Sequence, residues 1–330
     1  MKIKIYCQAL FIIFCFSASH AQKFRYSIPG LDTLQESFIV SGAASSVLRQ
    51  GQTEFIFNNS LISYWIAFHE NGKNSPILDR LRNTLFLSEL SGYYGISSSG
   101  RIDAGIQVGY ARTRLDNSSS SSPFRVFRKT TNENINEEAF TQVRFDDSFG
   151  GLAYVGARLR FKPITYEPGF ILTAGYSVST IKDESQQVQL NADRDFFDLG
   201  ASYYKSVTNN VYYFFSTSLR GYLSSDVTPE SLYNSSFNFF LIHRTNNQKL
   251  TFYPGISYNL AFKPSTYDSH PFIKSTEFLF AYGGLQYSIN RKANIFLTMG
   301  IPLFINIINP LQDIVRESYS VTVLGARIGI

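Results

Sequence analysis

The sequence is poor in the residues that most often build chemical sites. It contains two cysteines, one tryptophan, two methionines and four histidines among 330 residues. Both cysteines, Cys7 and Cys15, lie in an N-terminal segment that we expect to be cleaved off. The mature chain would then have no cysteine, which excludes disulfides, thiolate catalysis and Cys-zinc sites.

Long apolar runs and a strong charge bias are also missing. No uncharged apolar stretch after residue 21 approaches the length of about 20 residues that a membrane-spanning helix needs. Of the 30 basic residues, Lys2 and Lys4 leave with the N-terminal segment, so 28 face 25 acidic ones. This balance is too even to indicate nucleic acid as a partner.

Residues 1–21 have the features of a secretory signal peptide. Lys2 and Lys4 form a basic start, and an apolar run from Ile5 to Ala18 follows. Ser19-His20-Ala21 then supplies small residues at the −3 and −1 positions before Gln22. We expect cleavage after Ala21 and a mature protein beyond the inner membrane.

Aromatic residues are abundant, although the mean hydropathy is near zero. The chain has 30 Phe, 21 Tyr and 22 Gly. Apolar residues alternate with polar ones over long segments, as in the run from Arg101 to Tyr110, where Ile102, Ile106 and Val108 oppose Asp103 and Gln107. Membrane strands have this composition because only every second residue meets lipid.

The alternation predicts an all-β fold, a transmembrane antiparallel up-and-down β-barrel of about twelve strands over residues 51–330. These segments are longer than the usual globular strand of about 5–6 residues and match a strand that crosses a bilayer. The expected strands are 53–70, 82–97, 101–114, 146–162, 169–182, 194–207, 211–224, 233–245, 248–262, 275–289, 294–306 and 318–330.

The links between these strands alternate in length. Short links such as Ser98-Ser99-Gly100 and Asn246-Asn247 follow every even-numbered strand, and longer ones follow the odd-numbered strands. A soluble β-sandwich need not alternate in this way, whereas outer-membrane barrels combine short periplasmic turns with long outer loops. We therefore expect both ends of the barrel domain at the periplasmic side of the cell outer membrane.

Two segments and two prolines depart from the regular pattern. Residues 22–50 precede the first strand and are expected to form a periplasmic tail or a short plug, or to hide a misread strand pair. Pro254 and Pro302 fall inside strands and predict bulges or kinks. The loop 116–146 carries a serine tract and then Arg125, Arg128 and Lys129. It is either a mobile surface loop, or one that folds into the mouth or contacts lipopolysaccharide phosphates.

The pattern resembles the outer-membrane β-barrels of Bacteroidota-type bacteria. The resemblance is carried by the signal ending Ala21-Gln22, by Asn58-Asn59-Ser60-Leu61, and by Gly92-Tyr93-Tyr94-Gly95 before Asp103-Ala104-Gly105. It covers about a fifth of the chain, residues 51–114, and within that group the resemblance is to transporter-type barrels. It implies a channel or uptake barrel of unknown substrate, embedded in outer-membrane lipids and lipopolysaccharide.

Barrel-assembly machinery is a further expected partner. It recognises a last strand with alternating apolar residues and a terminal aromatic residue. Leu324, Ala326, Ile328 and Ile330 keep the alternation, but an isoleucine stands where the aromatic is expected.

No catalytic, metal or cofactor site is predicted. The histidines of the mature chain are His69, His243 and His270, and no pair has metal-ligand spacing. His69-Glu70-Asn71-Gly72 resembles the His-x-Ser-Asn-Gly stretch of outer-membrane phospholipases, but the nucleophilic serine is missing. We therefore expect a protein that is not an enzyme, a rim-active lipid hydrolase being the weakest of the readings.

The polar faces of the strands point to the lumen. They predict that the lumen is either a salt-bridged filling or a slightly basic pore that favours anions. The first hypothesis is a passive channel or transporter for small solutes, and the second is a structural, adhesive or complex-forming barrel whose loops bind partners. The expected pore-lining residues are Glu89, Arg101, Asp103, Gln107, Arg158, Arg160, Asp198, Arg220, Lys249 and Arg327.

Overall fold

The computed structural model describes residues 47–69, 77–116, 122–127, 148–164, 169–182, 190, 194–225, 231–264, 272–290, 292–307 and 314–330. The chain divides into two units, Met1–Glu36 and Ser37–Ile330, and all described residues belong to the second. The expected signal peptide, residues 1–21, and most of the segment 22–50 therefore lie outside the described residues, as does most of the loop 116–146.

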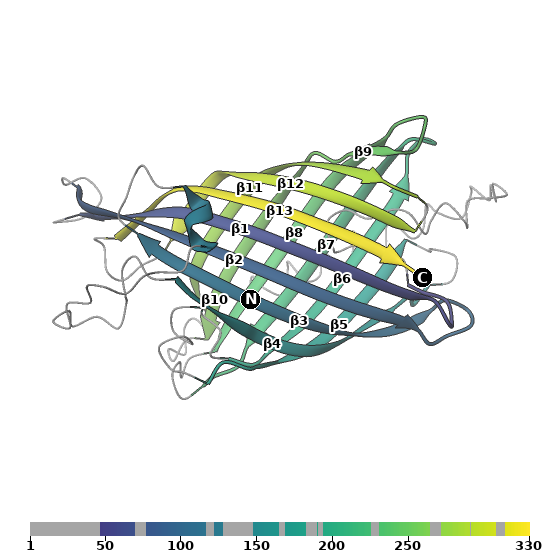
Figure 1. Cartoon of the computed structure of the whole chain (residues 1–330), viewed down its shortest axis with the longest axis horizontal. Coiled ribbons are helices and arrows are strands. Elements are labelled where there is room, and N and C mark those ends of the chain that lie inside the picture. The colour runs from purple at the N-terminus through teal and green to yellow at the C-terminus, as the bar shows by residue number, and fades with distance from the viewer. Residues whose placement is uncertain are drawn as a thin grey trace. The chain divides into compact units, whose positions relative to one another are not determined.

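The second unit is a closed antiparallel β-barrel with twelve strand positions, as the alternation predicts. Each strand pairs with its neighbours in the chain, and the last strand pairs with the first from Glu54–Gly329 to Phe68–Ile314 (Figure 1). The strands are β1 (Thr53–His69), β2 (Ile77–Gly95), β3 (Ile102–Asp116), β4 (Ser148–Phe161), β5 (Phe170–Ser179), β6 (Phe196–Ser206), β7 (Val211–Tyr222), β8 (Leu232–Arg244), β9 (Leu250–Phe252), β10 (Gly255–Pro264), β11 (Phe272–Ser288), β12 (Ala293–Ile307) and β13 (Ile314–Gly329).

The two prolines disturb the strand pairing, as the sequence predicts. Pro254 separates β9 from β10, and both pieces pair with β8 and β11, so they occupy one position in the barrel. Opposite Pro302 the register of β11 and β12 shifts between Leu279 and Phe280. A proline has no N–H for the ladder, so each strand must bend or bulge there.

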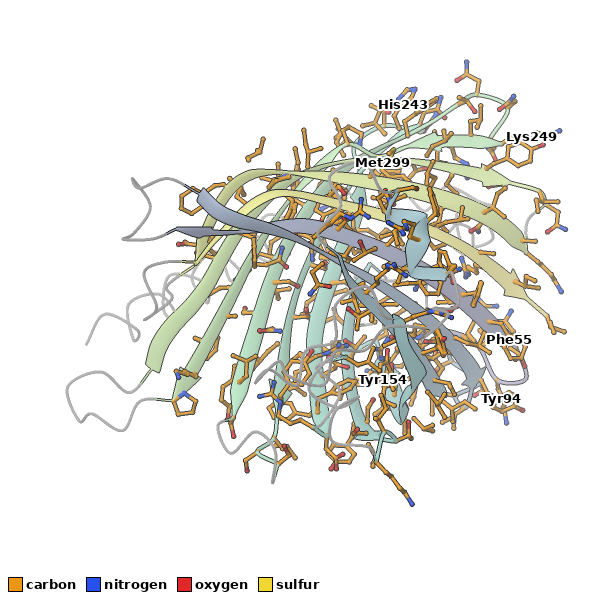
Figure 2. The ribbon with its side chains drawn as sticks, turned by 60° about the vertical axis from the view of Figure 1, so that its left-hand side comes forward. Phe55, Tyr94, Tyr154, His243, Lys249 and Met299 are labelled. Carbon is orange, nitrogen blue, oxygen red and sulfur yellow. The ribbon has the colours of Figure 1, made fainter. Side chains whose placement is uncertain are left out.

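The period-2 alternation separates an outward face from the lumen face. Ile106 is 66 % exposed whereas its neighbour Gln107 is fully buried, and on β5 Val178 is exposed whereas Ser177 is buried. Tyr94 and Phe55 belong to the exposed apolar set at the end of the barrel where β1 begins (Figure 2). An apolar outward band with aromatic residues near its edge is the surface that lipid requires.

One position departs from the simple alternation. Alternation along β4 predicts Ala153 on the lipid face with Val155, and this is wrong: Ala153 is 5 % exposed and packs against Ala111 on the lumen side. The register explains the difference, because Gly109 pairs with Tyr154 while Tyr110 pairs with Leu152. Ala153 is the extra residue of a β-bulge, which places two successive side chains on the same face.

The two ends of the barrel differ. The links after β2, β4, β6, β8 and β11 are short, and the link after β2 uses Gly100 at a positive φ of 65°. We call this side the turn end; the start of β1 and Ile330 lie there (Figure 1). The opposite side is the loop end. Among the described residues no helix has the length and apolar composition to cross a membrane.

Candidate functional site: the barrel lumen

A buried ionic cluster occupies the turn end of the lumen. Arg160 of β4 donates from Nε to Oδ1 and from Nη2 to Oδ2 of Asp103, at 2.8 Å each, and from Nη1 to Glu54 at 3.1 Å. Glu54 also accepts a hydrogen bond from Nε of Arg327 on β13. The guanidinium of Arg160 lies 3.8 Å from the ring centroid of Tyr93. We call Glu54, Asp103, Arg160 and Arg327 the turn-end cluster.

The chain segment before β1 closes over this cluster. The backbone N–H of Leu48 donates to Oδ2 of Asp103 at 2.8 Å, and the Leu48 side chain packs with Ile56 and Tyr93. Residues 50 and 51 are held by backbone bonds to Ser97 and Gly95. Val47 and Leu48 are both almost fully buried. The last residues of the expected tail or plug thus enter the lumen from the turn end; we call residues 47–50 the latch.

A second ionic cluster lies further along the lumen. Arg158, two residues from Arg160 on β4, approaches Glu89 at 3.8 Å and Asp198 at 3.5 Å. Arg220 forms a two-bond pair with Asp198, at 2.7 and 3.2 Å. The Tyr154 hydroxyl donates to Glu89 at 2.5 Å. Together the two clusters contain four arginines and four carboxylates, so their charges cancel.

Next to the second cluster is a cavity of about 420 Å³. Its walls combine aliphatic and aromatic side chains with the paired ionic groups. The ring of Tyr154 packs edge-on against Phe196 at 5.0 Å, and Arg220 lies 4.3 Å over the Phe196 ring. The lining residues are Asn58, Ser60, Leu85, Leu87, Ser88, Glu89, Tyr110, Ala111, Ala153, Tyr154, Leu190, Arg194, Phe196, Arg220, Tyr222 and Val323.

A glycine and a loop residue shape this cavity. A Cβ on Gly109 would lie 2.2 Å from the Tyr154 ring, so the glycine is what lets the ring lie against β3. Leu190 comes from the link between β5 and β6 and packs with Ala111 and Ala153 inside the lumen. The Leu190 side chain is therefore part of the cavity wall.

The other side of the lumen is lined by different groups. Small polar residues of β7 and β8 bond to one another, for example Ser218 to Ser236 at 2.7 Å and Asn238 to Ser216 at 3.2 Å. Nearer the turn end, a buried and mainly aromatic cluster is formed by Phe214 of β7, Phe240 and Ile242 of β8, and Tyr253 at the junction of β9 and β10. The described turn-end half of the lumen is thus occupied by packed side chains.

The ten expected pore-lining residues divide into two groups. Eight of them lie within the lumen networks: Glu89, Asp103, Gln107, Arg158, Arg160, Asp198, Arg220 and Arg327. Arg101 instead lies at the turn-end rim and donates to the carbonyls of Lys162 and Pro163. Lys249 is exposed in the turn before β9 (Figure 2).

Four lumen residues were missed by the sequence reasoning. Glu54 lies on the same face of β1 as Asn58 and Ser60, so the alternation along this strand is a signal that it faces the lumen. Tyr93 and Tyr154 have the right parity but look like lipid-facing aromatics. Leu190 follows a polar link and carries no sequence signal of its position.

The three histidines of the expected mature chain are the candidates for catalysis or metal binding. His243 is exposed at the turn end, the side chain of His69 is not described, and His270 lies outside the described residues. Over the described ranges there is no group of three or more His, Cys, Asp or Glu side chains able to hold a metal ion.

Comparison with known proteins gives a likeness in three dimensions. No protein-family model and no curated protein sequence matches the chain. The structure is similar to the COG4313 outer membrane channel from Pseudomonas putida F1, with a TM-score of 0.57 and 12% identity over 89% of this chain and 100% of that one. The likeness is one of fold. This chain therefore has the fold of an outer-membrane β-barrel channel.

Two further solved structures match with lower TM-scores. The β domain of the Bordetella autotransporter BrkA has a TM-score of 0.48 and 10% identity, over 84% of this chain and 99% of the other. A TodX monoaromatic hydrocarbon channel variant has a TM-score of 0.44 and 12% identity, over 89% and 91% of the two chains.

Proposed function

We propose that this protein is a passive outer-membrane channel for small solutes that have an apolar body. The observation that carries the proposal is the cavity beside Tyr154 and Phe196. Ligand sites typically enclose about 300–1,000 Å³ and are mostly apolar with a few polar groups, which describes this cavity. An apolar cavity of about 150 Å³ is known to hold benzene, so there is room here for a solute with more than one ring.

The pairing of the charges favours neutral solutes. Glu89 is bonded to Tyr154 and approached by Arg158, and Arg220 is paired with Asp198. A charged solute would have to compete with these partners, whereas a neutral one meets rings and aliphatic side chains. The slight anion preference expected from the sequence remains a prediction, and the equal number of arginines and carboxylates makes it small.

Passage to the periplasm requires movement at the turn end. The latch and the turn-end cluster lie between the cavity and the short turns, bonded through Leu48 and Asp103. We infer that a solute enters from the loop end, rests in the cavity, and leaves when these residues shift. Localisation in the outer membrane, after signal-peptide cleavage, belongs to this proposal.

A second candidate is a structural or partner-binding barrel that does not conduct. The filled turn-end half of the lumen favours it. Influx into proteoliposomes separates the two candidates: small neutral solutes of increasing apolarity are offered to vesicles with and without the barrel. Faster influx of the apolar members supports the channel, and influx equal to that of empty vesicles refutes it.

A further inference from the structure

A short 3-10 helix, η3 (Pro123–Phe127), packs on the outside of the barrel wall near the loop end. Its Val126 is fully buried, and Phe127 meets Phe86 of β2 at 4.7 Å between ring centroids, at 72°. Phe86 lies on the face opposite to Leu87 and Glu89, which face the lumen, because successive strand residues alternate. Arg82 also donates to the carbonyl of Ser122, just before η3, at 3.3 Å.

This helix lies where the outward face changes from apolar to basic. Along β3 the outward residue Ile106 is exposed and apolar, and the outward residues Arg112 and Arg114 lie further toward the loop end. Arg112 pairs with Phe86 in the ladder, so η3 and these arginines are at one height. Aromatic residues mark the edge of the hydrocarbon region in barrels, so this height corresponds to lipid headgroups.

The exposed side chains of η3 suit a lipid surface. Phe124 is 67 % exposed and Phe127 46 % exposed, although both extend from a helix whose Val126 anchors it to the wall. Arg125 lies between them. Exposed rings beside an arginine form a surface with an apolar part for acyl chains and a cationic part for phosphate, since guanidinium groups bind phosphate with two parallel bonds.

We propose that η3 and the outward arginines of β2 and β3 form a binding site for a phosphorylated lipid of the outer leaflet, of the lipid A class. Arg112 and Arg125, both partly exposed, contact the phosphate. Arg82 and Arg114 lie buried beneath η3, where Arg82 donates to the carbonyl of Ser122. The rings of Phe124 and Phe127 contact the acyl chains. This site rests on the proposed membrane location but not on conduction, because it faces away from the lumen.

The test uses the full barrel purified in detergent and given lipid A, or lipid A whose phosphates have been removed. Native mass spectrometry counts the bound lipid. We expect wild type to prefer the phosphorylated lipid. In the double variant Arg112→Glu, Arg125→Glu, the ratio of phosphorylated to dephosphorylated lipid bound should fall by about tenfold or more, because charge-assisted hydrogen bonds to the phosphate are lost.

The control carries the same charge change at the opposite end of the barrel. Lys205→Glu, Lys249→Glu alters two exposed residues near the turn end and should bind like wild type. Phe124→Ser should weaken both lipids equally, since it removes only acyl contact. Heat-modified mobility on gels verifies that each variant has folded.

Three results would overturn the site: equal binding of the two lipids, a preference that survives in the arginine variant, or a protein partner retained in place of lipid. Solute influx is measured on the same preparations. Lipid preference without influx would contradict the channel alone, and influx without lipid preference would contradict this site alone.

Discussion

Arg160 holds Asp103 with two parallel hydrogen bonds of 2.8 Å, although the side chains are only 5 % and 0 % exposed. The pair joins β3 to β4 inside the lumen, and the same carboxylate receives the N–H of Leu48. One ion pair thus links the wall of the barrel to the segment that closes it.

Breaking this pair should destabilise the barrel. Asp103→Asn leaves the Arg160 charge buried with a weaker acceptor, which typically costs about 3–5 kcal/mol. Urea unfolding in micelles measures the loss. The double variant Asp103→Asn, Arg160→Met should recover part of the stability because no charge is left uncompensated; a double variant less stable than the single one would contradict this explanation.

The latch should control conduction. Leu48→Asp places a second carboxylate beside Asp103, and repulsion together with the lost apolar contact to Tyr93 should release the segment. Single-barrel conductance in a planar bilayer is then expected to rise. Gln50→Asp is the matched control, because Gln50 is exposed and held through its backbone. Equal conductance of both variants would show that the latch does not close the lumen.

Much of the fold follows from the sequence. Because each strand has lipid on one side and the lumen on the other, its apolar and polar residues must alternate. The alternation over Arg101 to Tyr110 identifies β3 and places Asp103 and Gln107 correctly. Contacts between distant strands are harder to predict. The alternation shows whether a side chain faces the lumen or the lipid, but it does not show how far along the barrel axis the side chain lies or which residue it contacts. Gln107 reaches over β4 to Ser177 of β5 at 2.6 Å, a contact that no local pattern contains.

The candidate site was only partly predictable for the same reason. The bulge at Ala153 changes which residues of β4 face the lumen, and the Gly150-Gly151 pair just before it does not by itself locate the extra residue. The charges of the lumen were found, but their pairing was not. That pairing turns an apparent basic surplus into a balanced network around an apolar cavity.

Removing a lumen carboxylate should therefore create anion selectivity. Asp198→Asn leaves Arg220 and Arg158 without their shared carboxylate, so the reversal potential in a salt gradient should move toward that of the anion. Asp195→Asn is the control, since Asp195 binds Tyr176 and the backbone of Ser179 outside this network. An unchanged reversal potential in Asp198→Asn would place the ion path elsewhere.

The central claim is that solutes pass through the cavity beside Tyr154. The most direct measurement is influx of a small apolar solute into proteoliposomes containing wild type, Gly109→Val or Gly283→Val. A side chain at Gly109 collides with the Tyr154 ring, whereas one at Gly283 meets open space on an exposed position. Influx is expected to fall strongly in Gly109→Val and to stay at the wild-type rate in Gly283→Val. Equal influx through all three barrels would show that solutes do not pass through this cavity.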